Sequence, residues 1–134
     1  MAKEFTYMGK TLTELQSMST DDFAKLTTSR ARRSLKRGID KSMLVKIMAA
    51  HAKLKQEGKA PIKAIRTHLR HFVIIPHMVG LKFAIHRGNS FDQFEVQPEM
   101  VGHMVGEYIL TRKYVKHGKA GIGSTKSSSA VTAK

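Results

Sequence analysis

The clearest pattern of apolar and polar positions lies in residues 81–96. Apolar residues alternate with more polar ones on both sides of a short polar stretch, Arg87–Ser90. The apolar positions are Leu81, Phe83, Ile85, Phe94 and Val96. Alternation with a period of two is typical of strands that bury one face, so the pattern predicts a β-hairpin with its turn at Arg87–Ser90.

The segment before this hairpin, residues 62–76, carries apolar residues that fit neither the strand period nor the helix period cleanly. We expect a strand near Ala64–His68, then a turn, then an extended buried run. Pro76 ends this run, because proline has no backbone N–H to donate to a sheet. Together with the hairpin, the strand predicts a small antiparallel sheet.

The first half of the chain has the pattern of short helices. Thr11 and Glu14 have the spacing of a capping box, which predicts a very short helix after them. Ser19, followed by two acidic residues, predicts the start of a second helix that ends at Gly38. The apolar anchors of this second helix are Phe23, Leu26 and Leu35.

A third helix is predicted to start at Asp40 or Ser42, since either side chain can cap its first turn. Apolar residues follow at helical spacing and give this helix one core-facing side. They are Met43, Ile47, Ala50 and Leu54. Gly58 is expected to close the helix, and Lys59–Pro61 to form a linker to the second half.

A further short helix is predicted to begin at Pro98, because proline suits the first helical position. Val101, Met104, Val105 and Tyr108 would form its apolar face. Gly102 and Gly106 also fall on one side of this helix, where each costs roughly 1 kcal/mol relative to alanine. Two explanations for these glycines are given equal weight: close packing of the helix on the sheet, and close approach of an RNA backbone.

The charge balance indicates an anionic partner. The chain of 134 residues has 24 Lys and Arg against 10 Asp and Glu, a net charge of +14, and a pI of about 10.3. A pI above roughly 9 is typical of nucleic-acid-binding domains. We expect an α+β fold divided into a basic helical extension (1–58), an α+β RNA-binding core (59–115) and a basic tail (116–134), which is disordered in the free protein.

Other classes of protein are disfavoured. The chain has no cysteine, which excludes a disulfide framework and a cysteine zinc site. The first residues lack the apolar stretch of a signal peptide and no window has the length of a membrane span, so a cytoplasmic location is expected. Sparse aromatic residues predict binding through backbone shape and charge instead of base-by-base recognition.

Residues 30–37 place basic side chains on several sides of the second predicted helix. A solvated charged face is the ordinary explanation of such a run, but the net charge favours contact with phosphate. A hydrolase that uses His68 and His71 is the enzyme alternative, and the same histidines suggest a metal site as a separate hypothesis. Arg66 and Arg70 lie beside these histidines and oppose a divalent cation, so no metal, cofactor or active site is expected.

The segments PHMVG (Pro76–Gly80) and GHMVGEYILTRKYVKHGKAGIGSTKSS (Gly102–Ser128) carry a family resemblance. They closely resemble the signature of the universal small-subunit ribosomal protein S-nineteen, in the archaeal and eukaryotic branch whose eukaryotic members are often called S-fifteen. The resemblance covers most of the chain. It implies binding to the 3′ major domain of small-subunit rRNA in the subunit head, with ribosomal protein S-thirteen as a neighbour and the tail directed toward tRNA and mRNA in the decoding region.

Taken together, the basic pattern and the resemblance select candidate rRNA-binding residues. They are Arg30, Arg32, Arg33, Lys36, Arg37, Arg66, Thr67, His68, Arg70, Lys82, Arg87, Gly88, Asn89, Gly102, His103, Gly106, Thr111, Arg112 and Lys113. The resemblance assigns a second set to the decoding region: Lys116, His117, Gly118, Lys119, Gly121, Gly123, Thr125, Lys126, Ser127 and Ser128. A free-standing DNA-compacting protein is the alternative from outside the ribosome, although no repeated or dimeric binding element is visible.

Overall fold

A computed structural model of the chain describes residues 5–57, 63–116 and Gly118. Its helices are α1 (Leu12–Ser17), α2 (Thr20–Leu26), α3 (Ser29–Lys36) and α4 (Lys41–Glu57), with short 3₁₀ helices η1 (Pro76–Met78), η2 (Pro98–Met100) and η3 (Val105–Glu107). Its strands are β1 (Thr6–Tyr7), β2 (Lys10–Thr11), β3 (Ile65–Thr67), β4 (Lys82–His86) and β5 (Phe91–Glu95). The predicted α+β fold class is confirmed. Among the described helices, none has the length and apolar character needed to cross a membrane.

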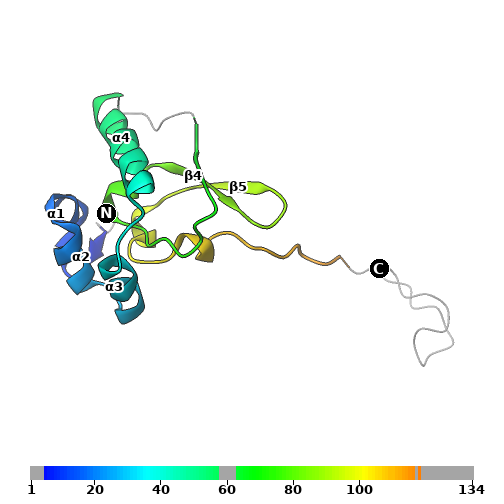
Figure 1. Cartoon of the computed structure of the whole chain (residues 1–134), viewed down its shortest axis with the longest axis horizontal. Coiled ribbons are helices and arrows are strands. Elements are labelled where there is room, and N and C mark those ends of the chain that lie inside the picture. The colour runs from blue at the N-terminus through cyan, green and yellow to red at the C-terminus, as the bar shows by residue number, and fades with distance from the viewer. Residues whose placement is uncertain (1–4, 58–62, 117, 119–134) are drawn as a thin grey trace.

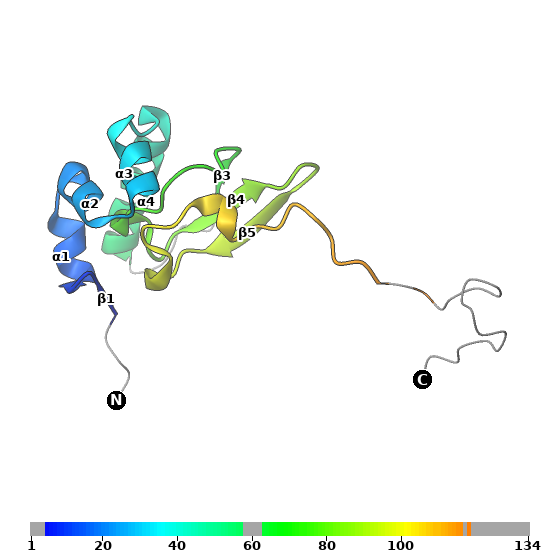
Figure 2. The same ribbon diagram turned by 90° about the horizontal axis from the view of Figure 1, so that it is seen from below.

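The helices α1, α2 and α3 gather at one end of the molecule, and the β4–β5 hairpin extends from its middle (Figure 1). The view from below shows the same separation between the helical end and the hairpin (Figure 2). Residues 110–116 are all exposed and run away from this body. The described chain therefore has a compact part followed by a projecting segment of exposed residues without regular secondary structure.

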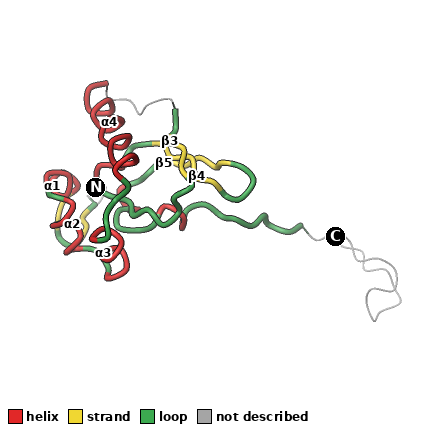
Figure 3. The backbone as a smooth tube through the Cα atoms, viewed as in Figure 1, coloured by secondary structure: helices red, strands yellow, loops and turns green. Residues whose placement is uncertain are grey.

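The main sheet has the strand order β3–β4–β5 (Figure 3). The hairpin β4–β5 is antiparallel with Phe83 opposite Phe94, as the alternating pattern predicts. Strand β3, predicted near Ala64–His68, is present but runs parallel to β4. Parallel neighbours need a crossover of about a dozen residues or more, and residues 68–81 supply it. This crossover is the reason that the sheet is mixed and not antiparallel throughout.

One hydrophobic core joins the helical half to the sheet half. Helices contribute Leu15, Phe23 and Ile47, and the sheet and its crossover contribute a larger set of fully buried residues. This set is Ile74, Ile75, Met78, Leu81, Phe83 and Ile85. The predicted extended run that ends at Pro76 thus lies in the core. Because both halves contribute to a single cluster, the helical segment packs as part of the same body.

The predicted helix starts are confirmed at α1 and α2. The Glu14 Oε2 atom accepts a hydrogen bond from the Thr11 N–H at 2.9 Å, and the Ser19 hydroxyl accepts one from the Asp22 N–H at 3.2 Å. The prediction of one helix from Ser19 to Gly38 is wrong, because α2 ends before Thr27 and α3 begins after Thr28. Thr27 has an extended backbone, and its hydroxyl donates to the Ala24 carbonyl at 2.9 Å, which competes with helix continuation.

Helix α4 follows the predicted pattern. Asp40 caps it, since its Oδ1 atom accepts a hydrogen bond from the Ser42 N–H at 2.9 Å. The predicted face packs inward: Met43, Ile47 and Ala50 are buried, and Leu54 packs partly buried against the core. The predicted stop at Gly58 and the linker Lys59–Pro61 lie outside the described residues.

The predicted helix from Pro98 is wrong. The segment forms two separate 3₁₀ turns, η2 and η3, and Gly102 between them has a φ of +86°, which a right-handed helix does not allow. The Ile74 N–H donates to the His103 carbonyl at 2.8 Å, and the Gly102 N–H donates to the Ile74 carbonyl at 3.0 Å. The segment therefore satisfies backbone groups of the buried run, which would otherwise lack partners in the core.

Candidate nucleic-acid interface

The exposed side of α3 forms a basic surface. Ala31 and Leu35 bury the opposite side of this helix, which turns its basic residues outward. A hollow of about 690 Å³ lies along that side, and no acidic residue lines it. Its lining is Ser29, Arg30, Arg32, Arg33, Lys36 and Arg37. We call the four cations Arg30, Arg33, Lys36 and Arg37 the α3 basic surface; their spacing along one helix suits contact with successive phosphates.

Arg32 lies on the same helix and is exposed, but its guanidinium group turns back onto the end of α2. Its Nε and Nη2 atoms donate to the carbonyl oxygens of Ala24, Lys25 and Thr27 at 3.0 to 3.2 Å. These carbonyls are at the end of α2, where they have no partner within the helix. Arg32 therefore caps α2, and its predicted contact with RNA stays a prediction.

The hairpin tip and the segment after η3 form a second basic surface. They enclose a hollow of about 290 Å³ that again has no acidic lining residue. Its lining is Arg87, Gly88, Asn89, Leu110, Thr111, Arg112 and Lys113. Six of these seven were predicted as RNA-binding from two separate stretches of sequence, and the fold brings them together. We call this group the tip surface.

The tip surface is held in shape by local bonds. The Arg87 guanidinium donates to the Asp92 carboxylate at 2.8 Å and to the Ser90 hydroxyl at 2.9 Å. Gly88 has a φ of +124°, which side chains rarely tolerate. Local hydrogen bonds and a glycine with a positive φ therefore define the conformation of the hairpin turn.

Arg70 connects the hairpin to the segment behind it. Its guanidinium donates to the carbonyl oxygens of His86 at 3.0 Å, Gly106 at 2.8 Å and Ile109 at 2.6 Å. Thr67, also a candidate, is buried, and its hydroxyl accepts a hydrogen bond from the Leu69 N–H at 3.1 Å. Both side chains act inside the protein, and their predicted RNA contacts stay predictions.

The two glycines of the 102–106 segment are explained by close packing. A β-carbon on Gly106 would lie 2.8 Å from the Arg70 carbonyl oxygen, and one on Gly102 would lie 2.5 Å from the Tyr7 hydroxyl. The expected packing of a helix on the sheet does not occur, because this segment is not one continuous helix. Contact with the Arg70 backbone accounts for Gly106, and the positive φ together with the nearby Tyr7 ring accounts for Gly102, while RNA approach stays a prediction. His103 between them is exposed, and its Nδ1 lies 2.9 Å from the Glu107 carboxylate.

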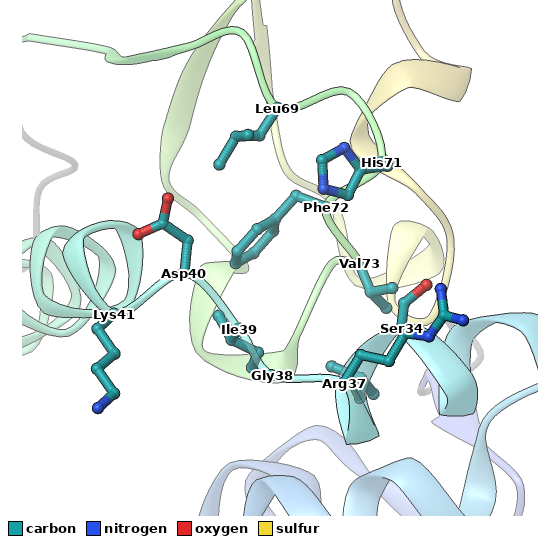
Figure 4. Close-up of a pocket in the computed structure, with 11 residues that line it drawn as sticks. Ser34, Arg37, Gly38, Ile39, Asp40, Lys41, Leu69, His71, Phe72 and Val73 are labelled. Atoms are coloured by element: carbon teal, nitrogen blue, oxygen red, sulfur yellow. The ribbon is translucent and has the colours of Figure 1, made fainter.

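A further cleft of about 470 Å³ lies where the α3–α4 junction meets the start of the buried run (Figure 4). Ser34 and Leu35 of α3 and residues 37–41 line one side, and Leu69, His71, Phe72 and Val73 line the other. Its rim carries Arg37, Lys41 and His71 beside a single acid, Asp40. The cleft was not predictable from the sequence, because no local pattern indicates that these two stretches meet.

The histidines do not gather into a metal site in the described part of the chain, which holds no group of three or more His, Cys, Asp or Glu arranged for a cation. His51 is buried, and its ring packs edge-on against His77 with 5.2 Å between centroids. Burial lowers the pKa of both rings, and nearby Lys55 lowers them further; His77 also acts on His51. Both effects favour the neutral form of these imidazoles over the protonated form.

The predicted tail lies almost entirely outside the described residues. Lys116 and Gly118 are described and exposed. The remaining tail candidates, His117 and those from Lys119 onward, are not described, so their predicted order and contacts stay predictions.

A small α+β body with two acid-free hollows lined by basic residues is typical of proteins that bind nucleic acid. Residues 33–117 match the family model of ribosomal protein S19. The small ribosomal subunit protein uS19 of Saccharolobus solfataricus is 46% identical over 129 residues, which cover 94% of this chain and 89% of that protein. The chain belongs to the ribosomal protein S19 family, which confirms the resemblance on which the sequence analysis relied.

Proposed function

We propose that the chain is a structural component of the small ribosomal subunit and that it binds small-subunit rRNA in the subunit head. Family membership supports a ribosomal role over the hydrolase and over the free-standing DNA-compacting protein. The observation that carries RNA binding is the absence of acidic residues from both basic hollows. Apart from Arg87, which is paired with Asp92, the cations that line these hollows form no ion pair with any described residue, and such cations bind phosphate by releasing its counterions.

The two basic surfaces divide this binding by chemistry. The α3 basic surface offers four exposed cations and little else, which suits contact with the RNA backbone. The tip surface adds the Asn89 amide and the Thr111 hydroxyl, which can donate to or accept from sugar and base edges. The first surface supplies affinity and the second adds selectivity for RNA shape.

The salt dependence of binding tests this division. A triple variant, Arg30→Ala, Arg33→Ala and Lys36→Ala, should flatten the slope of log affinity against log salt on a 3′ major domain rRNA fragment by about 0.7 to 0.9 per lost contact. A matched control removes the same charge from exposed lysines of α4: Lys46→Ala, Lys53→Ala and Lys55→Ala. An equal loss in both variants would mean that only net charge matters, and the α3 basic surface would then have no specific role.

The finer placement rests on the resemblance. The resemblance supports two placements. Ribosomal protein S-thirteen is the protein neighbour, and the tail from Lys116 to Ser128 reaches toward tRNA and mRNA. Crosslinking inside assembled subunits tests the protein neighbour and the tail placement, with a photoreactive residue introduced at position 112 or at position 126. Crosslinks from position 126 to tRNA or mRNA are expected, and crosslinks only to distant rRNA would remove the tail proposal.

A further inference from the structure

A cluster of rings and one guanidinium lies on the face of the main sheet opposite the core. The ring centroids of His68 and His86 are 4.4 Å apart, and Phe91 lies 5.2 Å from His68 and 5.0 Å from His86. The Arg66 guanidinium carbon sits 5.7 Å from the centre of the Phe91 ring. We call these four residues the ring cluster.

Strand register explains why the cluster forms on this face. His86 is directly opposite Phe91 in the hairpin, and Arg66 pairs with Ala84, two positions before His86. Side chains alternate between the faces of a sheet, so these residues share one face. Phe83 and Ile85 point to the other face, where they are fully buried. The hydrophobic core therefore uses one face and leaves the ring cluster on the other.

The ring cluster is accessible and has no acidic partner. Arg66 and His68 are exposed, and His86 and Phe91 are partly exposed. Across the residues that the structure describes, Arg66 forms no hydrogen bond or ion pair through its side chain. The His86 Nδ1 atom accepts a hydrogen bond from the Gly88 N–H at 3.2 Å, which fixes the ring next to the hairpin turn.

Hairpin stability explains only part of this arrangement. A directly opposite aromatic pair such as His86 and Phe91 stabilises two strands by roughly 0.2 to 1 kcal/mol. That role requires neither His68 nor Arg66, which come from β3 and its crossover and stay in solvent. Flat rings and a guanidinium collected on an open face, in a chain of charge +14, match a ligand that has both a π surface and negative charge.

We propose that the ring cluster is a stacking site for an unpaired nucleobase of RNA, with Arg66 bound to the phosphate beside that base. The proposal rests on RNA binding by this chain and adds a mode of recognition that the two basic hollows do not provide. Single-stranded bases stack on aromatic, histidine and arginine side chains in many RNA-binding proteins. The exposed His68 ring is the contact surface, and His86 and Phe91 support it from below.

Two single-stranded probes that differ only in having or lacking bases separate the contribution of stacking from that of charge. The first probe is an oligouridylate of about twelve nucleotides, and the second is an abasic strand of the same length and charge. We expect the full chain to bind the oligouridylate more tightly, and NMR signals of the His68 and Phe91 rings to shift with that probe alone. His68→Ala should weaken oligouridylate binding about 5- to 100-fold while leaving the abasic strand and the salt slope unchanged.

Two further variants keep the test decisive. His68→Trp should restore or strengthen binding, because a larger ring stacks better. Phe91→Leu should weaken oligouridylate binding, and a thermal melt checks that this variant stays folded. If it does not fold, the result for His68→Ala decides the test, because His68 is exposed and its replacement should not affect folding. Equal binding of both probes, or no effect of His68→Ala, overturns the stacking site while RNA binding stands. If the chain bound neither of the two probes nor rRNA, that result would instead refute the proposed function.

Discussion

Arg70 shows how a basic residue that the sequence assigns to RNA can be needed inside the protein. Its three hydrogen bonds reach the end of β4, the turn η3 and Ile109, segments that are otherwise separate. Arg32 has the same role at the end of α2. Both arginines carry a positive charge that could bind RNA, but only the fold determines whether that charge contacts a carbonyl oxygen of the protein or a phosphate.

Arg70→Ala should lower the free energy of unfolding by about 3 kcal/mol, because three carbonyls lose a charged donor in a partly buried site. Arg70→Lys should recover only part of this, since an ammonium group cannot reproduce the guanidinium fork. Urea unfolding followed by circular dichroism measures the difference. Arg37→Ala is the control: Arg37 is exposed and donates no side-chain hydrogen bond to any described residue, so a change within about 0.5 kcal/mol is expected. Equal effects at positions 70 and 37 would contradict the account.

The contact between α4 and η1 carries a titratable pair, of which His51 is buried and His77 is partly buried. His51 comes from α4 and His77 from η1, and burial lowers the pKa of each below its ordinary value. Protonation is then easier in the unfolded chain than in the folded one. The pair therefore contributes its full stability above about pH 6.5 and loses it as the pH falls from there through the folded pKa.

The urea concentration at the unfolding midpoint should decrease as the pH is lowered from about 7.5 to about 5. The exposed carboxylates Asp22 and Asp40 stay ionised over this range, because their pKa values are lowered. His51→Leu should reduce this pH dependence, since leucine keeps the apolar contact and does not titrate. His68→Leu is a matched control at an exposed histidine. A pH profile that is unchanged by His51→Leu would show that the pair does not govern it.

Elements with a local pattern were predicted well from the sequence. The hairpin and α4 follow their apolar periods, and the starts of α1 and α2 follow their capping residues. The helix predicted from Pro98 failed because the same apolar spacing, Val101 and Val105, also suits a segment packed against the buried run. Non-local hydrogen bonds to Ile74 decided the outcome, and no local pattern encodes them.

The candidate interface was predictable in part at the scale of the whole molecule. The basic stretch 30–37 and the hairpin turn were both identified, but the sequence could not show that residues 110–113 join the turn in one hollow. Only two members of the ring cluster, Arg66 and His68, were candidates from the sequence, and nothing local joins them to His86 and Phe91. Its members come from three strands and a crossover, and their shared face depends on a parallel pairing that the hairpin pattern does not reveal.

The body should not need the tail for stability. The last buried residue in the described part of the chain is Ile109, and residues 110–116 are exposed. Deleting residues 117–134 should therefore leave the melting temperature of the isolated protein within about 2 °C of the full chain. A larger fall would mean that the deleted residues contribute to the folded body. In ribosomes we expect the same deletion to alter tRNA selection or late subunit maturation, which a translation-fidelity assay measures.

The central claim is that this chain works as an rRNA-bound component of the small ribosomal subunit. Sucrose-gradient fractionation of a cell extract, with ultraviolet crosslinking and sequencing of the attached RNA, tests it most directly. We predict that the chain migrates with small subunits and that its crosslinks map to the 3′ major domain, with fewer of them after the Arg30, Arg33 and Lys36 substitutions. A chain that stays at the top of the gradient, or whose crosslinks map to DNA or to unrelated RNA, would contradict the claim.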